Sequence, residues 1–122
     1  MPIRAMSFYH TQAAIAQRRK TVTRTARWAM LEPGELLRAV KRSRGIAKAD
    51  REELALLEVV DVRTELLGDI TDSDIVLEGL KDWTKQEFID WFINLNSVIG
   101  IPMTAQAPVR RIEFKYVKIV DE

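Results

Sequence analysis

The chain of 122 residues contains no cysteine and a single histidine, His10. Without cysteine it has neither a disulfide framework nor a thiolate zinc site, and one histidine excludes most histidine-based metal sites. We therefore expect no metal and no cofactor. No apolar run approaches the roughly 20 residues of a membrane span, and the first ten residues lack the long apolar segment of a signal peptide. These absences predict a cytoplasmic protein without a membrane partner.

The first half of the chain has few acidic residues, and the second half has few basic ones. Residues 1–51 hold 12 lysines and arginines against three acidic residues, for a net charge of +9, and the remainder holds 7 against 15, for −8. Such asymmetry predicts a polyanionic partner for the basic half. The alternative is that the two halves neutralise each other across the folded surface. The length predicts one domain over residues 1–122.

The first half of the sequence favours strands. Short apolar or β-branched runs predict strands at 3–8, 21–25, 35–40 and 54–67. A helix is expected over 12–19 with Thr11 as its N-cap, and the polar, basic stretch 41–53 is expected to be an exposed loop. The last of these strands is long enough to bend or bulge.

The second half favours helices followed by one strand. Thr71 is expected to cap a short helix that ends at Gly79, and Thr84 with Glu87 forms the capping-box pattern of a second helix. That helix carries an apolar stripe, which helical periodicity assigns to the core rather than to a ligand platform: Phe88, Trp91, Phe92, Leu95 and Ile99. An irregular connection is expected over 96–108.

The final segment, 111–120, alternates apolar and charged residues and predicts a half-exposed strand with Ile112, Phe114 and Tyr116 on one face. The order β-α-β-β-β-α-α-β has strands at both ends. A last strand that returns to pair with early strands indicates an α+β fold built on a small, closed or partly open mixed β-barrel with flanking helices.

The segment 18–28 is the densest group of ligand-binding side chains. It holds five basic residues, three threonines and one tryptophan within eleven positions. In an extended chain Lys20 and Arg24 lie on one face and the threonines on the other. Basic groups contact phosphates, hydroxyls donate hydrogen bonds and an indole stacks on a base. The alternative is a solvated basic edge with Trp28 in the core. The candidate binding residues are Arg18, Arg19, Thr21, Arg24, Arg27 and Trp28, with Arg42, Arg44 and Lys48 from the following loop.

An ordered set of short motifs resembles the ASCH family of the PUA-like superfamily of small β-barrels. The motifs are Arg19-Lys20-Thr21-Val22-Thr23-Arg24, Pro33-Gly34-Glu35, Asp69-Ile70-Thr71, Glu78-Gly79 and Ile112-Glu113-Phe114. Together they run from about Ser7 to Val117. Glu35 departs from the family pattern, in which many relatives carry aspartate after the glycine.

The resemblance implies a cleft beside the Lys-Thr-x-Thr-Arg segment, facing the helix that ends in Glu-Gly. Members of the family are thought to bind RNA. Some small bacterial members resemble amidohydrolases that deacylate N4-acetylcytidine with a lysine, a threonine and a glutamate. These roles would fall on Lys20, Thr23 and Glu78. Another branch is associated with ribonuclease activity. The resemblance therefore implies RNA or a modified nucleoside as partner.

The residues permit this chemistry but do not require it. A threonine hydroxyl needs a base to become a nucleophile, and Lys20 can act as that base only if burial or neighbouring cations lower its pKa. Glu78 would orient the lysine or shuttle a proton, or it would simply neutralise the basic strand. A non-catalytic protein-interaction module is a third class of function. There are three weaker candidates. Tyr9 is expected at the cleft mouth and His10 at a turn. Trp83 is expected to pack as a staple against the following helix.

Overall fold

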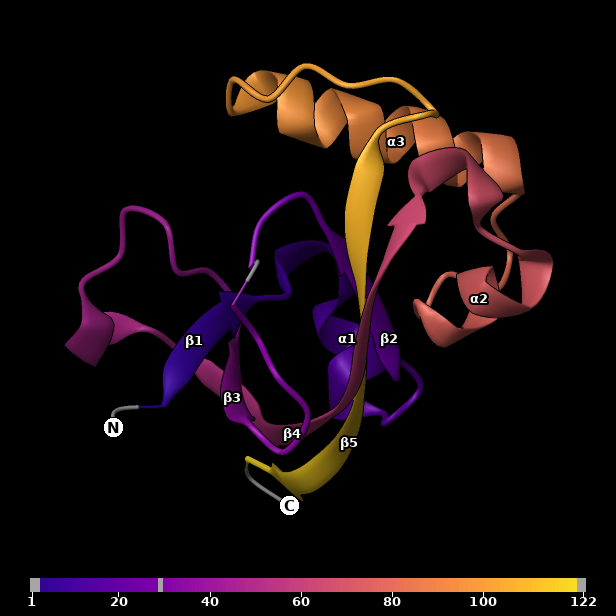
Figure 1. The fold of residues 1–122 in the computed structure, drawn as a ribbon. Coiled ribbons are helices and arrows are strands. Elements are labelled where there is room, and N and C mark those ends of the chain that lie inside the picture. The colour runs from indigo at the N-terminus through magenta and orange to yellow at the C-terminus, as the bar shows by residue number, and fades with distance from the viewer. Residues whose placement is uncertain (1–2, 29, 121–122) are drawn as a thin grey trace.

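In a computed structural model, which describes residues 3–28 and 30–120, five strands form one mixed sheet in the order β1-β3-β4-β5-β2. The strands are β1 (Arg4–Ser7), β2 (Val22–Thr25), β3 (Leu36–Val40), β4 (Glu53–Leu66) and β5 (Pro108–Ile119). β1 runs parallel to β3, and the other neighbours are antiparallel. The sheet curves into a half-barrel (Figure 1). This is the partly open form of the predicted barrel.

Long strands with register shifts produce the curvature. β4 is 14 residues long, and its pairing with β5 shifts near Leu56 and again between Val59 and Asp61. A further shift separates Ala39 from Val40 in the β3–β4 pair. Such bulges bend a strand and increase its twist. The bend expected in the segment 54–67 is therefore present.

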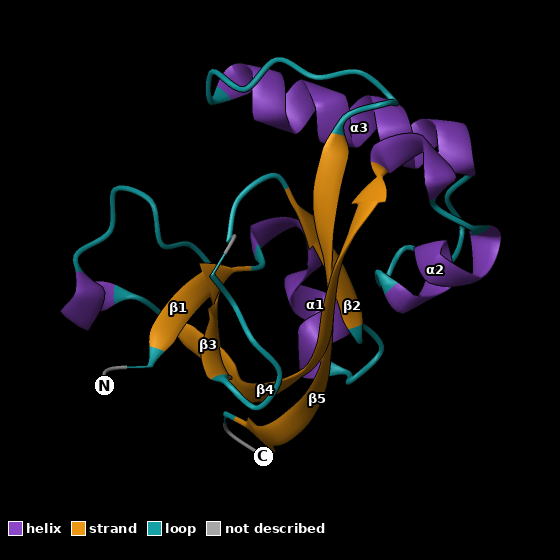
Figure 2. Ribbon diagram, in the orientation of Figure 1, coloured by secondary structure: helices purple, strands orange, loops and turns teal. Residues whose placement is uncertain are grey.

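Three helices accompany the sheet: α1 (Gln12–Ala16), α2 (Asp72–Leu77) and α3 (Lys85–Val98). α1 contacts β4 and adds Ile15 to the core inside the curve of the sheet. α3 crosses the end of the β4–β5 pair (Figure 2). None of the helices in residues 3–28 and 30–120 has both the length and the apolar character to cross a bilayer.

The core consists of two apolar clusters. One fills the curve of the sheet and includes Phe8, Ile15, Leu57 and Phe114. The other packs α2 and α3 against the ends of β4 and β5, and it includes Ile75, Phe88, Phe92 and Val109.

The predicted elements are present, with different boundaries at both helical junctions. Thr11 is the N-cap residue of α1, as predicted, but its side chain makes no capping hydrogen bond. α1 ends at Ala16 rather than 19 because Arg18 takes a left-handed conformation, with φ of 57°. α3 continues through Asn96, whose side-chain amide donates to the Phe92 carbonyl within the helix. The irregular connection therefore begins after Val98 rather than at 96.

The caps predicted for α2 and α3 are confirmed. The Thr71 hydroxyl accepts from the Asp74 backbone N–H, and Thr84 with Glu87 makes the reciprocal capping box. The last strand is also confirmed, and it pairs with both β2 and β4. Ile112 and Phe114 are buried and Tyr116 packs against them. Arg111, expected on the exposed face, is instead buried, because it forms an ion pair described below.

Candidate functional site

A cleft of about 650 Å³ lies between the two core clusters. Its lining includes Phe8 from the cluster inside the sheet and Phe88 and Phe92 from the cluster under α3. Volumes of roughly 300–1,000 Å³ are typical of small-ligand sites, and sites between packed units are common. We refer to this cavity as the cleft.

The three residues for which the family resemblance implies catalysis, Lys20, Thr23 and Glu78, all line the cleft. Lys20 and Glu78 are 2 % and 3 % exposed, so the pair is shielded from water. The Lys20 Nζ donates to the Glu78 Oε1 at 2.8 Å and to the Glu78 carbonyl oxygen at 2.8 Å. Residues 58 positions apart in the sequence therefore share one buried hydrogen-bonded site.

Gly79 allows this approach. It has φ of 88°, a left-handed conformation that glycine adopts without strain. A Cβ at this position would lie 2.6 Å from the Ala14 Cβ and 3.4 Å from the Lys20 Cβ. Any side chain here would push the end of α2 away from α1 and from Lys20. The glycine of the Glu-Gly motif is therefore required to bring Glu78 against Lys20.

Burial opposes the charge on Lys20. Loss of solvation lowers the pKa of Lys20 from its ordinary value, and the attraction of Glu78 only partly opposes that shift. Arg24 adds a smaller effect in the same direction as burial. A lysine in this setting loses its proton more readily than one in water.

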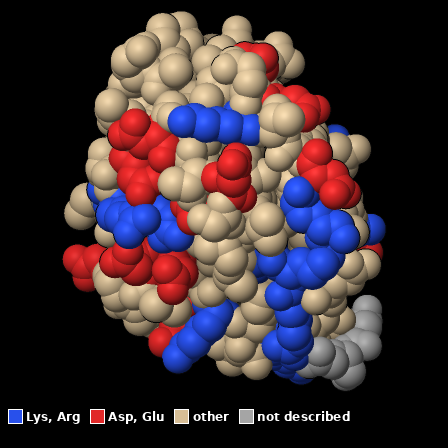
Figure 3. Space-filling view, turned by 90° about the vertical axis from the view of Figure 1, so that its right-hand side faces the viewer, with Lys and Arg blue, Asp and Glu red and all other residues tan. Residues whose placement is uncertain are grey.

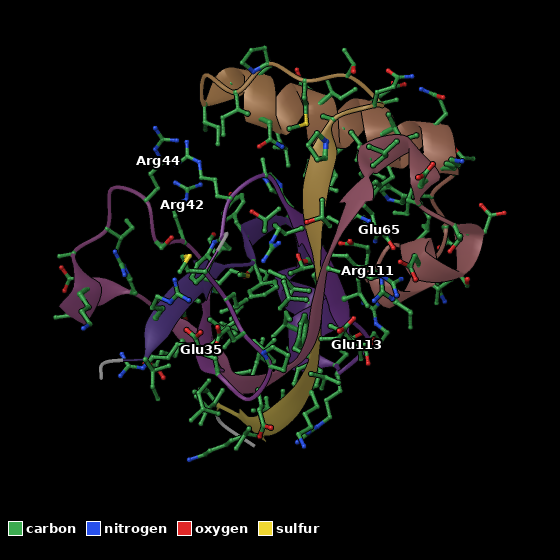
Figure 4. The ribbon with its side chains drawn as sticks, in the orientation of Figure 1. Glu35, Arg42, Arg44, Glu65, Arg111 and Glu113 are labelled. Atoms are coloured by element: carbon green, nitrogen blue, oxygen red, sulfur yellow. The ribbon has the colours of Figure 1, made fainter. Side chains whose placement is uncertain are left out.

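Arg24 joins the cleft to a buried ion network. Its guanidinium donates through Nη1 to the Glu78 Oε2 at 3.1 Å, and through Nη2 to the Glu65 Oε1 at 2.9 Å and to the Asp74 Oδ2 at 2.5 Å. Arg111 donates to both carboxylate oxygens of Asp74, at 2.7 and 3.1 Å. Glu65 and Arg111 project from neighbouring strands toward α2 (Figure 4).

This network sets the charge state of Asp74. Hydrogen bonds from Arg111, and secondarily from Arg24, lower the pKa of Asp74 to about 2 despite its burial. The carboxylate is therefore ionised throughout the neutral range and ties α2 to β2 and β5. Because Arg24 also holds the Glu78 Oε2, the network fixes the orientation of the carboxylate that faces Lys20.

Aromatic rings form one wall of the cleft. The rings of Tyr9 and His10 are edge-to-face, with their centroids 5.1 Å apart. Those of His10 and Trp91 are edge-to-face as well, with their centroids 5.6 Å apart. The apolar stripe of α3 thus serves two purposes. Phe88 and Phe92 are in the core as predicted, whereas Trp91 and Leu95 are only partly buried and line the cleft with them. Ile99, also expected in the core, is exposed. Trp83 packs on Trp91 at 5.3 Å, as expected of a helix staple.

Arg42 and Arg44 lie at the rim. Both are exposed, both line the cleft, and both project from the loop between β3 and β4 on the side that faces α3 (Figure 4). The Arg42 guanidinium lies 4.4 Å from the centroid of the Tyr9 ring. Among residues 3–28 and 30–120, neither arginine has a carboxylate partner.

The remaining basic candidates lie elsewhere. Arg18 is stacked on the ring of Tyr116, Arg19 donates to Gln17, and Arg27 is exposed. Trp28 packs against the core with Arg4 over its ring, and it does not line the cleft. The predicted alternation holds, since Lys20 and Arg24 are buried and the three threonines only partly so. Thr21 lies outside the cleft, whereas Thr23 and Thr25 line it.

Ion pairs between the two halves neutralise part of the positive charge of the first half. Lys20 and Arg24 pair with Glu65, Asp74 and Glu78 of the acidic half. On the α2 side of the molecule, groups of basic and acidic side chains lie next to one another (Figure 3). Arg42, Arg44 and Lys48 take no part in such pairs within the described chain.

Sequence reasoning missed Asp74, Glu65 and Arg111. The local pattern places Asp74 only in the first turn of a helix, and it places Arg111 on an exposed strand face. Within residues 3–28 and 30–120, no group of three or more histidines and carboxylates is arranged to hold a metal ion.

Comparison with known proteins yields matches in structure but not in sequence. No family model and no curated protein matches the chain. Protein EF3133 from Enterococcus faecalis V583, described by the family model DUF984, has a TM-score of 0.72 at 16% identity, covering 98% of this chain and 78% of its own. An ASCH domain from Lactobacillus crispatus has a TM-score of 0.68 at 13% identity, covering 95% and 80%.

A third structure, a mutant of the ASCH protein from Zymomonas mobilis, has a TM-score of 0.54 at 11% identity, covering 93% of this chain and 70% of its own. Identities this low establish the fold and not the activity. The fold of this chain is that of ASCH domains, as the motifs predicted.

Proposed function

We propose that the cleft binds a nucleobase, either of a free modified nucleoside or of an RNA strand. The observation that carries the proposal is the convergence of Lys20, Thr23 and Glu78 in a cleft of nucleoside size with an aromatic wall. An aromatic ring offers a base a stacking surface. Buried polar groups opposite that ring supply the hydrogen bonds that select among bases.

Arg24 supplies a further polar group to this site. Its Nε is buried and has no hydrogen-bond partner in the described chain, although Arg24 lines the cleft. A buried donor left unsatisfied costs about 1–3 kcal/mol. A ligand acceptor recovers that cost only if the Arg24 side chain shifts enough to expose this N–H to the cleft.

The rim arginines favour a ligand with phosphates. Arg42 and Arg44 are exposed, lack carboxylate partners among the described residues and border the cleft. A guanidinium matches the geometry of a phosphate and forms paired hydrogen bonds with it. A strand with one base in the cleft would therefore place its neighbouring phosphates at this rim.

RNA binding is expected to weaken with salt, with log K linear in log[salt]. The double substitution of Arg42 and Arg44 by glutamine should make the slope shallower by about 1.4, or about 0.7 for each lost contact with a single strand. Fluorescence anisotropy of a labelled 12-nucleotide RNA at several salt concentrations measures both quantities. Lys81 and Lys85, which are exposed and lie outside the cleft, provide the matched double glutamine control. Absence of binding to any RNA at low salt would refute this half of the proposal.

A second candidate function is hydrolysis of an acylated cytidine such as N4-acetylcytidine. The observation that favours it is the buried Lys20–Glu78 pair with lowered lysine pKa in the same cleft as the Thr23 hydroxyl. A neutral lysine amine has two N–H groups and a lone pair. One N–H donates to the Glu78 carbonyl oxygen and the other to the Glu78 Oε1. The lone pair of the amine is therefore left to accept a proton.

The chemistry then proceeds in two halves. The Thr23 oxygen bonds to the acyl carbon as its proton moves to Lys20, and the carbonyl electrons move to oxygen. The carbonyl re-forms as the carbon–nitrogen bond breaks, and the proton on Lys20 passes to the departing amine. Water then attacks the threonine ester, so that the acid is released and the hydroxyl is restored.

A further inference from the structure

We propose that a second, smaller hollow at the other end of the β3–β4 loop binds the phosphate backbone of single-stranded RNA whose base lies in the cleft. The hollow has a volume of about 340 Å³ and is bordered by β1, β3 and the end of that loop. We refer to it as the basic hollow. The inference rests on the proposed function, because the strand in question leaves the cleft.

Cations dominate the lining of the basic hollow. Arg4, Arg38, Lys48 and Arg51 line it, and Glu53 is the single carboxylate among its lining residues. None of these four cations lies in the cleft. The hollow is therefore a separate positive site and not an extension of the first.

The existing ion pairs of these cations are exposed to solvent or absent among the described residues. Arg38 lies 3.5 Å from Glu53, and Arg4 pairs with Glu35, labelled in Figure 4, in ion pairs that are about one third to one half exposed. Exposed pairs of this kind contribute little, at about 0–1 kcal/mol. Exchanging such a carboxylate for a phosphate therefore costs little.

Lys48 and Arg51 are less committed still. Arg51 donates its Nε to the Ile46 carbonyl at 3.2 Å, which leaves both terminal nitrogens of its guanidinium, and Lys48 has no ion pair within the described chain. Asp50 and Glu52 are near them in sequence but do not line the hollow, and Glu52 already pairs with Lys41 at 2.6 Å. Two of the four cations thus face the hollow without a carboxylate partner among the described residues.

The loop connects the two sites over a distance that a short strand can span. Arg44 lines the cleft and Lys48 lines the basic hollow. Four residues of extended chain reach at most about 14 Å, and a stacked strand carries one charge about every 3.4 Å. About four nucleotides beyond a phosphate held at Arg44 therefore suffice to reach Lys48. A free nucleoside or a dinucleotide does not reach it.

The test compares RNA lengths in the full chain. The double substitution of Lys48 and Arg51 by glutamine should leave binding of a dinucleotide unchanged and weaken binding of a 12-nucleotide RNA, with a salt slope shallower by about 1.4. For each phosphate contact, the affinity for a single strand rises about fivefold when the salt concentration falls from 1 M to 0.1 M. The loss of one contact removes that fivefold gain. Lys48→Gln alone should show half of the slope change. This single variant guards against a disturbed loop, because Lys48 is exposed and its side chain makes no hydrogen bond within the described chain. Lys81 and Lys85 again give the matched control.

Unchanged 12-nucleotide binding by the double variant, or equal affinity for the dinucleotide and the longer RNA, would overturn the inference. Binding of polyglutamate as tight as that of RNA would assign the basic hollow to an acidic protein instead, and would also overturn it. If Trp91→Ala has no effect on either RNA while the hollow variant still weakens the longer one, the cleft proposal fails and the basic hollow stands as a phosphate site.

Discussion

Thr23→Val is expected to reduce the kcat/KM for hydrolysis of N4-acetylcytidine by at least about a thousandfold, if the cleft is an amidohydrolase site. Valine matches threonine in shape and removes only the hydroxyl that would attack. Thr23 is partly buried and its hydroxyl makes no hydrogen bond within the described chain, so the fold should tolerate the change. Release of cytidine, followed by chromatography, measures the rate.

The matched control for this variant is Thr21→Val. Thr21 lies in the same segment with similar burial, but it does not line the cleft. Its rate should equal that of the wild type, and Thr23→Ser should retain part of the activity because it keeps a hydroxyl. Full activity in Thr23→Val would exclude threonine as the nucleophile.

Lys20→Arg separates catalysis from binding. A guanidinium keeps the positive charge but does not lose a proton in proteins, so it cannot serve as a base. Hydrolysis should be lost, whereas nucleoside affinity should persist if the site only binds. A thermal melt checks that the larger buried side chain has not unfolded the Lys20→Arg protein.

The wild-type protein should also show a pH dependence. Because the pKa of Lys20 is lowered, the hydrolysis rate should rise with pH at a midpoint below 10.5, as the lysine deprotonates.

Asp74→Ala is expected to lower the free energy of unfolding by about 3–5 kcal/mol, which for a chain of this length lowers the Tm by roughly 10–20 °C. The change leaves the buried Arg111 with only a 3.6 Å ion pair to Glu113. It also removes one of the three carboxylates to which the buried Arg24 donates. Asp72→Ala is the control, because Asp72 is exposed in the same helical turn and has no ion pair in the described chain. A loss of less than about 1 kcal/mol in Asp74→Ala would show that the network contributes little.

The same residue predicts a pH dependence. The pKa of Asp74 is lowered from 3.8 to about 2 in the folded protein, chiefly by the hydrogen bond from Arg111. A lowered folded pKa contributes stability above about pH 4 that is lost as the pH falls toward about 2. The difference in stability between the wild type and Asp74→Asn should therefore shrink over that range. Urea unfolding at each pH measures it, and a constant difference would contradict the assignment.

Local patterns in the sequence were sufficient for most of the fold. The Thr84–Glu87 capping box and the alternation around Ile112 and Phe114 depend on neighbours within a few residues, and the structure confirms both. Thr11 occupies the predicted N-cap position of α1, but its side chain makes no capping hydrogen bond, and a 3₁₀ turn over Tyr9–Thr11 leads directly into the helix. The residue type therefore predicted where the helix starts but not the hydrogen bond.

The ion network could not be predicted in the same way. Asp74 and Arg111 are 37 positions apart, and each resembled an ordinary exposed residue of its own element. Their meeting depends on how α2 packs on β5, which no periodicity encodes. The convergence of Lys20 and Glu78 was expected only through the family resemblance, and Gly79 supplies its physical reason.

The structure of a crystal soaked with cytidine, N4-acetylcytidine and short RNAs tests the central claim most directly. We predict electron density for a base in the cleft, against Trp91 on one side and within hydrogen-bond reach of Lys20 or Thr23 on the other. Density for a base elsewhere on the protein, or an empty cleft at saturating ligand concentration, would contradict the proposed function.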